Sequence, residues 1–303
     1  MHLHALAATA QGPPPLGFCV ATPFPAGDPA QPWTSTFLDW FKHPPCANPI
    51  WSPTTDAALR DRTLAIMTRR NIYGVTSGDR LDDWRQGGNR IIPSLLMDFA
   101  DPLPSVETVR QWFTERRYVA LGEVAIQYQG AEPGDPRFEP YAALAEALDV
   151  PVSIHVGTGP PGAPYLGFDK YRARLHSPLL IEELLLRHPR LRVNLMHAGW
   201  PMLDDLLAVM WTHPQVYVDV GIISYALPRE AFQSYLHRIV EAGFGKRVMF
   251  GSDQMVWPEA IEAAIDSIEQ APFLSAEQKR DILFNNAARF LRFSPGDSPK
   301  HRE

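Results

Sequence analysis

The sequence contains only two cysteines, Cys19 and Cys46, in 303 residues. Two are too few for a disulfide framework and neither belongs to a CxxC motif, so the sequence leaves open whether they form a single bond. Apolar runs of roughly 18 residues, the length of a membrane-spanning helix, are missing. The N-terminus also lacks the basic segment of a signal peptide. We therefore expect a soluble protein in the cytoplasm.

Basic residues are not in excess. The chain has 28 Lys and Arg against 34 Asp and Glu, a formal net charge of -6. Without a basic stripe, nucleic acid and anionic membranes are poor candidates for a partner. The hydrophobic content of 45% is sufficient for a full core. We expect a small-molecule substrate, and the sequence leaves a homo-oligomer open.

Helix-like and strand-like segments alternate from residue 57 onward. Apolar strands are predicted at 71–76, 90–97, 118–123, 150–155, 191–197, 216–220 and 247–253. Helices are predicted at 57–70, 105–117, 137–148, 178–188, 202–212 and 229–242. This alternation predicts parallel strands joined by helical crossovers, and at this length an α/β fold of the (β/α)8 TIM-type barrel class.

The first of the eight strands is missing from this count. If His2 and His4 end that strand, the strand itself lies upstream of Met1. The sequence therefore predicts a first strand truncated at the N-terminus and an open edge of the sheet.

We expect one barrel domain over residues 1–293 and a polar, fraying tail over 294–303. Residues 10–55 are Pro-rich and too long for an ordinary connection, so they are predicted to form a lid over the mouth of the barrel. The aromatic residues of this segment either line the pocket or pack against one another. They are Trp33, Phe37, Trp40, Phe41 and Trp51.

Several predicted strands close with a side chain that can bind a metal. A polar residue is costly in the interior of a buried strand, but at its carboxyl end it faces the rim where barrel enzymes carry their chemistry. His2 and His4, two residues apart, point to the same side of their strand. The predicted ligands are His2, His4, Glu123, His155, His197 and Asp253.

Imidazoles combined with carboxylates suit zinc, with manganese or iron as alternatives, better than calcium. A metal with an open position lowers the pKa of bound water to near 7. Asp253 is suited to accept a proton from that water, and His197 or His155 to polarise a substrate. Each residue also has a structural interpretation, since His155 fits a core histidine, Glu123 a helix cap and Asp253 the N-cap of a following helix.

The order of these residues, together with His197-Ala-Gly-Trp-Pro201, Gly251-Ser-Asp253 and Asn285-Asn-Ala-Ala-Arg-Phe-Leu291, resembles the amidohydrolase superfamily in its amidohydrolase-related branch. The resemblance covers nearly the whole chain and implies a distorted (β/α)8 barrel with one or two divalent ions.

The same resemblance places His2, His4, His155, His197 and Asp253 on ligand positions, and Asp253 on the position that accepts a proton. Many binuclear members have a carboxylated lysine on the fourth strand. This chain has Glu123 there, similar to the TatD-like nucleases, so that Glu123 either bridges two ions or lies behind the ligands of a single ion.

The resemblance suggests a metal-dependent hydrolase of an amide, ester or lactone. The alternative is a nonoxidative decarboxylase of an aromatic or unsaturated acid, and the third hypothesis is a non-catalytic metal-binding barrel. A decarboxylase needs a cation or a metal for the substrate carboxylate and an apolar pocket for the ring. The candidate substrate-binding residues are Lys170, Arg174, Trp200 and Trp257.

Overall fold

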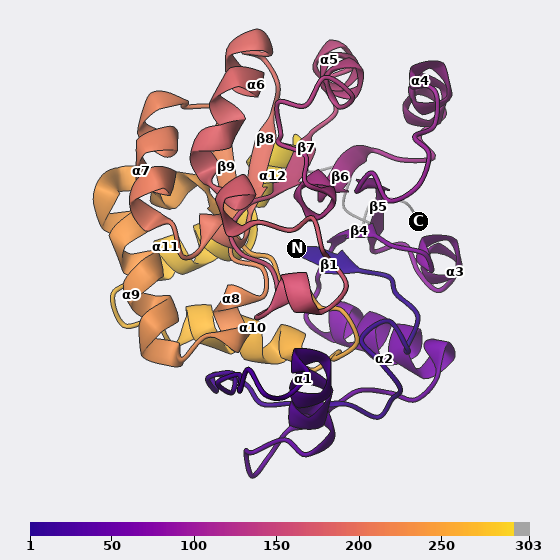
Figure 1. Ribbon diagram of the computed structural model, residues 1–303. Helices are drawn as coiled ribbons and strands as arrows, with labels where there is room; N and C mark the ends of the chain where they lie inside the picture. The colour runs from indigo at the N-terminus through magenta and orange to yellow at the C-terminus, as the bar shows by residue number, and fades with distance from the viewer. Residues whose placement is uncertain (294–303) are drawn as a thin grey trace.

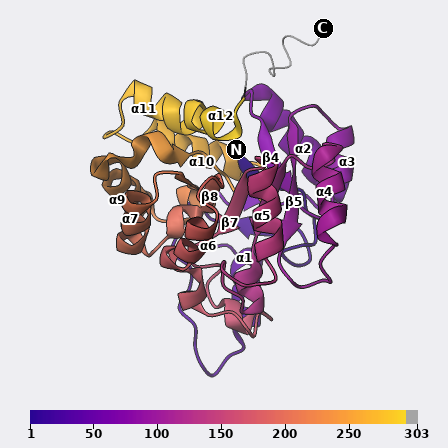
Figure 2. The ribbon, with the colours of Figure 1, turned by 90° about the horizontal axis from the view of Figure 1, so that it is seen from above.

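The computed structural model describes residues 1–293, and the tail expected over 294–303 lies outside them. Eight strands form one sheet in which neighbouring strands are parallel. In sheet order they are β1 (His2–His4), β4 (Gly74–Ser77), β5 (Ile91–Met97), β6 (Ala120–Val124), β7 (Val152–His155), β8 (Val193–Met196), β9 (Val216–Asp219) and β10 (Val248–Met249). Helices surround these strands on the outside (Figures 1 and 2). The fold is the TIM-type barrel that the alternation predicts.

All six predicted helices are present, with small shifts of their ends. The helices after the lid are α2 (Asp56–Arg69), α3 (Leu81–Gln86), α4 (Val106–Thr114), α5 (Glu139–Ala147), α6 (Glu182–Arg187), α7 (Leu203–Thr212), α8 (Ile223–Ala226), α9 (Arg229–Ile239), α10 (Ala260–Glu269), α11 (Ala276–Arg280) and α12 (Asn286–Leu291). Helix α4 begins where it does because the Ser105 hydroxyl accepts a hydrogen bond from the Thr108 amide at 3.1 Å.

Residues His2–His4 occupy the place of the strand that the sequence analysis expected upstream of Met1. On one side β1 pairs with β4. On the other, the His4 amide donates to the Gln254 carbonyl, and the amides of Ser252 and Asp253 donate to the His2 carbonyl. The two edges of the sheet are therefore joined, and the predicted open edge is absent from the part of the chain that the structure describes.

The lid segment leaves β1 and carries β2 (Gly17–Phe18), α1 (Trp33–Lys42) and β3 (Ile50–Trp51), with β2 and β3 antiparallel. Its aromatic side chains pack mainly on one another, as the second of the two interpretations predicted. The cluster consists of Phe18, Phe24, Phe37, Trp40 and Phe41, with Trp257 of the barrel stacked on Phe41. Trp51 is an exception, because 43% of it is exposed.

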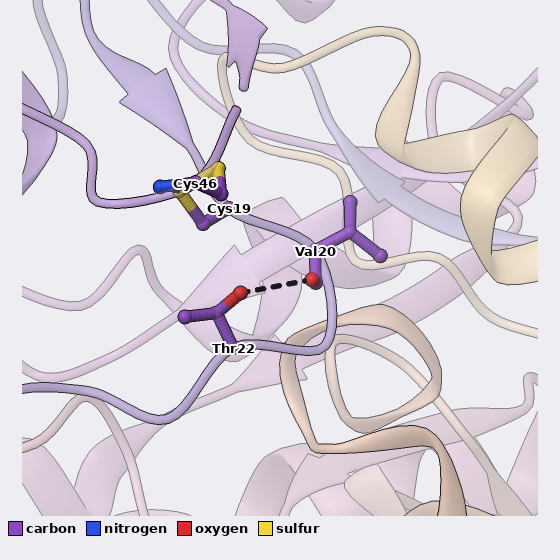
Figure 3. The surroundings of a disulfide bond; sticks show 4 residues. All are labelled: Cys19, Val20, Thr22 and Cys46. Atoms are coloured by element: carbon purple, nitrogen blue, oxygen red, sulfur yellow. Dashed lines mark hydrogen bonds between the residues drawn. A yellow bond between two sulfur atoms is a disulfide. The ribbon is translucent and has the colours of Figure 1, made fainter. Parts of the chain in front are cut away.

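Cys19 and Cys46 form a disulfide that closes a 27-residue stretch of the lid (Figure 3). The sequence left this bond undecided. Beside it, the Thr22 hydroxyl donates to the Val20 carbonyl at 3.1 Å. The far side of the lid is held by the Trp33 indole, which donates to the Pro161 carbonyl at 2.7 Å in the loop after β7. The segment is thus cross-linked within itself by the disulfide and joined to the loop after β7 by a hydrogen bond.

None of the helices within residues 1–293 combines the length and the apolar character needed to cross a membrane.

We predict that reduction of the disulfide destabilises the lid. A loop of 27 residues corresponds to about 3–4 kcal/mol in the chain-entropy description of a cross-link. Thermal unfolding and limited proteolysis, with and without a reductant, test this. The Cys19→Ser/Cys46→Ser variant should behave as the reduced protein and be insensitive to the reductant. Equal cleavage of the lid under both conditions would contradict the prediction.

Candidate metal centre

Five elements of the barrel bring the six predicted ligands together at the carboxyl ends of the strands. His2 and His4 lie on β1, which is in the middle of the ring of elements in Figure 1. Glu123 lies in β6 and His155 ends β7, whereas His197 directly follows β8 and Asp253 follows β10. The strand-end pattern in the sequence therefore identified residues that meet in space.

The six side chains are nearly inaccessible, with 3–7% of each residue exposed. His4 Nε2 lies 3.0 Å from Glu123 Oε2 and 2.9 Å from Asp253 Oδ1. On the other side of Glu123, His155 Nδ1 lies 2.5 Å from Oε1, and His197 Nε2 lies 3.1 Å from His155 Nδ1. Glu123 is thus the centre of the cluster.

The cluster contains two groups whose ligand atoms lie within 4.8 Å of one another. The first is His2, His4, Glu123 and Asp253, and the second is Glu123, His155 and His197. Both contain Glu123, so a single carboxylate connects the two. This buried donor set of imidazoles and carboxylates could bind a metal.

The surroundings of His2 show independently whether a metal ion fits this site. Neither of its ring nitrogens has a hydrogen-bond partner among residues 1–293. The nearest carboxylate oxygens are 3.6–4.0 Å away, on Asp219, Asp253 and Glu123. A buried polar group without a partner costs about 1–3 kcal/mol. A cation between these groups removes that cost, so the donors fit a metal.

Two of the six residues have a strained backbone. The φ angles of His197 and Asp253 are 58° and 51°, in the left-handed region that residues other than glycine rarely adopt. Such strain is typical of functional sites, where the surrounding structure enforces it. The site is also crowded around Gly221. A Cβ atom at this position would lie 2.9 Å from Asp219 Oδ1 and 3.1 Å from His2 Nδ1.

Burial and charge pairing act in opposite directions on the pKa values of the cluster. Burial lowers the pKa of His4, but hydrogen bonds to Asp253 and Glu123 outweigh it and raise the pKa to about 10. For His197 the same balance, with Glu123 and Asp253, raises the pKa to about 9. Burial would raise the pKa of Glu123, yet its hydrogen bonds with His155, His197 and His4 hold it well below the usual range. Without a metal, these carboxylates are neutralised by protonated histidines.

Asp219 is a further member of the site that the sequence analysis missed. It is fully buried, its Oδ2 lies 3.6 Å from His2 Nδ1, and it accepts hydrogen bonds from Asn194 Nδ2 at 2.7 Å and the Gly221 amide at 2.8 Å. Burial would raise its pKa, but the charge of His2 outweighs this and keeps the carboxyl ionised. A signal existed, since the strand Val216-Tyr-Val-Asp219 also ends in a carboxylate.

The four predicted substrate-binding residues are in different settings. Lys170 and Arg174 are exposed. Neither forms an ion pair with the cluster, because within residues 1–293 the ion pairs of Glu123, Asp219 and Asp253 are with histidines alone. Trp257 is 2% exposed, and its indole donates to the Leu16 carbonyl under the lid. Trp200 is half-buried directly after the turn that carries His197.

The model of a family described as Amidohydrolase matches residues 79–293, and the chain belongs to this family. The fluG protein of Emericella nidulans (strain FGSC A4) is 21% identical over 168 residues. The match covers 50% of this chain and 18% of fluG, so this chain spans only a small part of that protein's length.

Solved structures show the same fold. A probable 2-pyrone-4,6-dicarboxylic acid hydrolase from Acinetobacter baumannii superposes with a TM-score of 0.57 at 14% identity, over 82% of this chain and 93% of the other. A dihydroxybenzoic acid decarboxylase from Polaromonas sp. JS666, with bound manganese and an inhibitor, has a TM-score of 0.55 at 14% identity, covering 77% and 85%. Proteins that share this fold therefore include more than one kind of enzyme.

We predict that metal binding releases protons. His4 and His197, with pKa values raised to about 10 and about 9, are protonated at pH 7 and must lose these protons to bind a metal. Affinity should therefore rise with pH between 6 and about 9. Calorimetric titration with zinc in buffers of different ionisation enthalpy should give about two protons per protein. The exposed variant His43→Asn is the control, and an affinity independent of pH would contradict the prediction.

We also predict that Asp219→Asn weakens metal binding. The change removes the negative charge beside His2 but retains the shape of the side chain. Residues behind metal ligands typically contribute roughly 10- to 100-fold in affinity. Competition with a chromophoric chelator measures this, with Asp204→Asn on the exposed side of α7 as the matched control. If both variants bind zinc like the unmodified protein, Asp219 does not orient His2.

Proposed function

We propose that this protein is a metal-dependent hydrolase that cleaves an amide, ester or lactone of a small molecule. The observation that carries this proposal is the buried cluster of four histidines and two carboxylates at the carboxyl ends of the barrel strands. In TIM barrels this end of the sheet carries the chemistry. Membership of the amidohydrolase family supports the same conclusion.

His2, His4 and Asp253 would hold one divalent ion with Glu123, and His155 and His197 would hold a second ion or complete the surroundings of the first. We propose zinc, with manganese or iron as alternatives, because these ions accept imidazole and carboxylate together. The ion would supply a water that is acidic enough to be deprotonated near neutral pH. The manganese in the decarboxylase structure is compatible with this choice but does not identify the metal here.

We assign the role of general base to Asp253. Its carboxylate lies between the two histidine groups, with Oδ1 2.9 Å from His4 Nε2 and Oδ2 3.8 Å from His197 Nδ1. Asp253 would accept the proton of the attacking water as the new bond to the carbonyl carbon forms. It would return that proton to the leaving nitrogen or oxygen as the old bond breaks. If the site holds a single ion that His197 does not ligate, His197 would donate a hydrogen bond to the carbonyl oxygen, on which negative charge develops.

The lid would exclude bulk water from the site. Its aromatic cluster packs on Trp257 and on Tyr225, whose hydroxyl lies 3.5 Å from the Asp253 carbonyl. Because the predicted ligands are buried, a substrate would reach them only through a movement of the structure around them, which we assign to the lid. A small, largely apolar substrate fits such an enclosure best.

The decarboxylase remains the second candidate. It requires a cation or a metal at the substrate carboxylate. Lys170 and Arg174 could meet this requirement only if their loop closed over the site, because both side chains are exposed, whereas a metal held by the cluster could meet it directly. Trp200 and Trp257 would form part of the apolar surroundings of the substrate in either case.

The test is a substrate panel assayed on zinc-loaded and manganese-loaded protein. We expect acid release from an amide, ester or lactone, detected with a pH indicator, and a roughly 10²- to 10⁴-fold lower kcat in Asp253→Asn because the general base is lost. The exposed Asp101→Asn variant should retain full activity. Release of carbon dioxide from aromatic acids instead would establish the decarboxylase, and metal-loaded protein without turnover would point to a non-catalytic barrel.

A further inference from the structure

His176 is a buried histidine next to the metal centre that the proposed mechanism does not use. It lies in the loop after β7, 0% of it is exposed, and neither ring nitrogen has a hydrogen-bond partner within residues 1–293. Its ring stands edge-on to that of His155, with 5.2 Å between centroids and an angle of 81°. Tyr171 and Tyr128 cover the rest of it, at centroid distances of 4.4 and 5.5 Å.

His155 presents its two nitrogens to different surroundings. Nδ1 faces the cluster, 2.5 Å from Glu123 Oε1 and 3.1 Å from His197 Nε2. Nε2 is buried on the other side and has no hydrogen-bond partner in the described part of the chain. A metal bound through Nδ1 requires the neutral tautomer with its proton on Nε2. That N–H group then needs an acceptor, as the outer nitrogen of metal-binding histidines usually has one.

Two rings stand edge-on to His155 at 5.2 Å between centroids, those of His176 and Tyr128, and of these two it is His176 whose ring nitrogens are buried without a hydrogen-bond partner within residues 1–293. A neutral histidine ring carries one nitrogen that can accept a hydrogen bond. A buried donor and a buried acceptor, each without a partner, lie in neighbouring rings. Leaving both unsatisfied would cost about 1–3 kcal/mol for each.

We propose that His176 is a positioning residue that accepts a hydrogen bond from the Nε2–H of His155, directly or through one water molecule. The bond would hold His155 in the tautomer that leaves Nδ1 free for the metal. This inference rests on the metal centre of the proposed function but assigns a residue outside its ligand set.

The loop between the two histidines is anchored in a way that places His176 beside His155. The Gly157 amide donates to the His176 carbonyl at 2.8 Å, and the Gly159 amide donates to the Tyr171 hydroxyl at 2.7 Å. Gly157 has a φ of +93°, and a Cβ atom there would lie 2.5 Å from the Trp200 carbonyl oxygen. The loop therefore folds back to the end of β7, where Gly157 leaves no room for a larger residue. This path places His176 against His155.

The first experiment is nitrogen NMR of histidine side chains in the zinc-loaded protein, which reports the tautomer directly. We expect His155 to carry its proton on Nε2 with an exchange-protected resonance, and His176 to be neutral. His155 protonated on Nδ1 in the zinc-loaded protein, or a charged His176, would overturn the proposal. This measurement needs no variant and is unaffected if a substitution prevents folding.

The second experiment compares His176→Phe with His176→Gln for zinc affinity and for the visible absorption spectrum of the cobalt-loaded protein. The phenylalanine variant keeps the packing but loses the acceptor, so affinity should fall roughly 10- to 100-fold, whereas glutamine should restore it to within about threefold of the unmodified protein. Tyr165→Phe, at an exposed position of the same loop, is the control and should bind zinc normally. Unchanged affinity in a folded His176→Phe variant would overturn this inference alone, while an unmodified protein that binds no metal would overturn the proposed function as well.

Discussion

Closure of the barrel by three residues is the interaction on which the rest of the site depends. The backbone of His2–His4 hydrogen-bonds to β4 on one side and to the Ser252–Gln254 segment on the other. The first set of hydrogen bonds joins the start of the chain to β4, its neighbour in the sheet. The second set joins it to the segment that follows β10, the last strand. Because the same residues carry the His2 and His4 side chains, barrel closure and ligand assembly are a single event. A variant that loosened β1 would lose both.

The electrostatics of the cluster follow from this closure. Glu123, Asp219 and Asp253 are buried without a lysine or arginine partner among residues 1–293, and histidines surround them instead. Isolated buried carboxylates would be prohibitively costly, so the cluster must contain either protons on histidine or a metal ion. The two states are exclusive at His4 and His197, because a protonated imidazole cannot bind a cation. The same residues thus stabilise the metal-free fold and prepare it for a metal.

The predicted lid and the loop after β7 meet at the hydrogen bond from the Trp33 indole to the Pro161 carbonyl. Gly162 makes this approach possible, since a Cβ atom there would lie 2.1 Å from the indole nitrogen. The Cys19–Cys46 bond fixes the base of the lid. A disulfide persists more readily outside a reducing cytosol, so its redox state in the cell bears directly on the cytoplasmic location expected from the sequence.

The sequence alone was sufficient for the barrel and for the residues that gather in the buried cluster, because both leave local patterns. Strand and helix periodicity identifies the alternating elements, and a polar residue at the end of an apolar strand is visible without any knowledge of its neighbours. Asp219 shares this pattern and was missed because the predicted strand ran to residue 220, which placed Asp219 inside the strand, whereas β9 ends at Asp219.

Other features depend on distances between segments far apart in the chain, which periodicity does not encode. The three-residue strand β1 is too short to have a pattern of its own, and only its partners at Val75–Ser77 and Gln254 define it. Pairing of Cys19 with Cys46 and burial of His176 against His155 result from how two long irregular loops fold back on the barrel. The tertiary structure decided these features because loop conformation is set by packing and hydrogen bonds to the barrel rather than by local sequence preference.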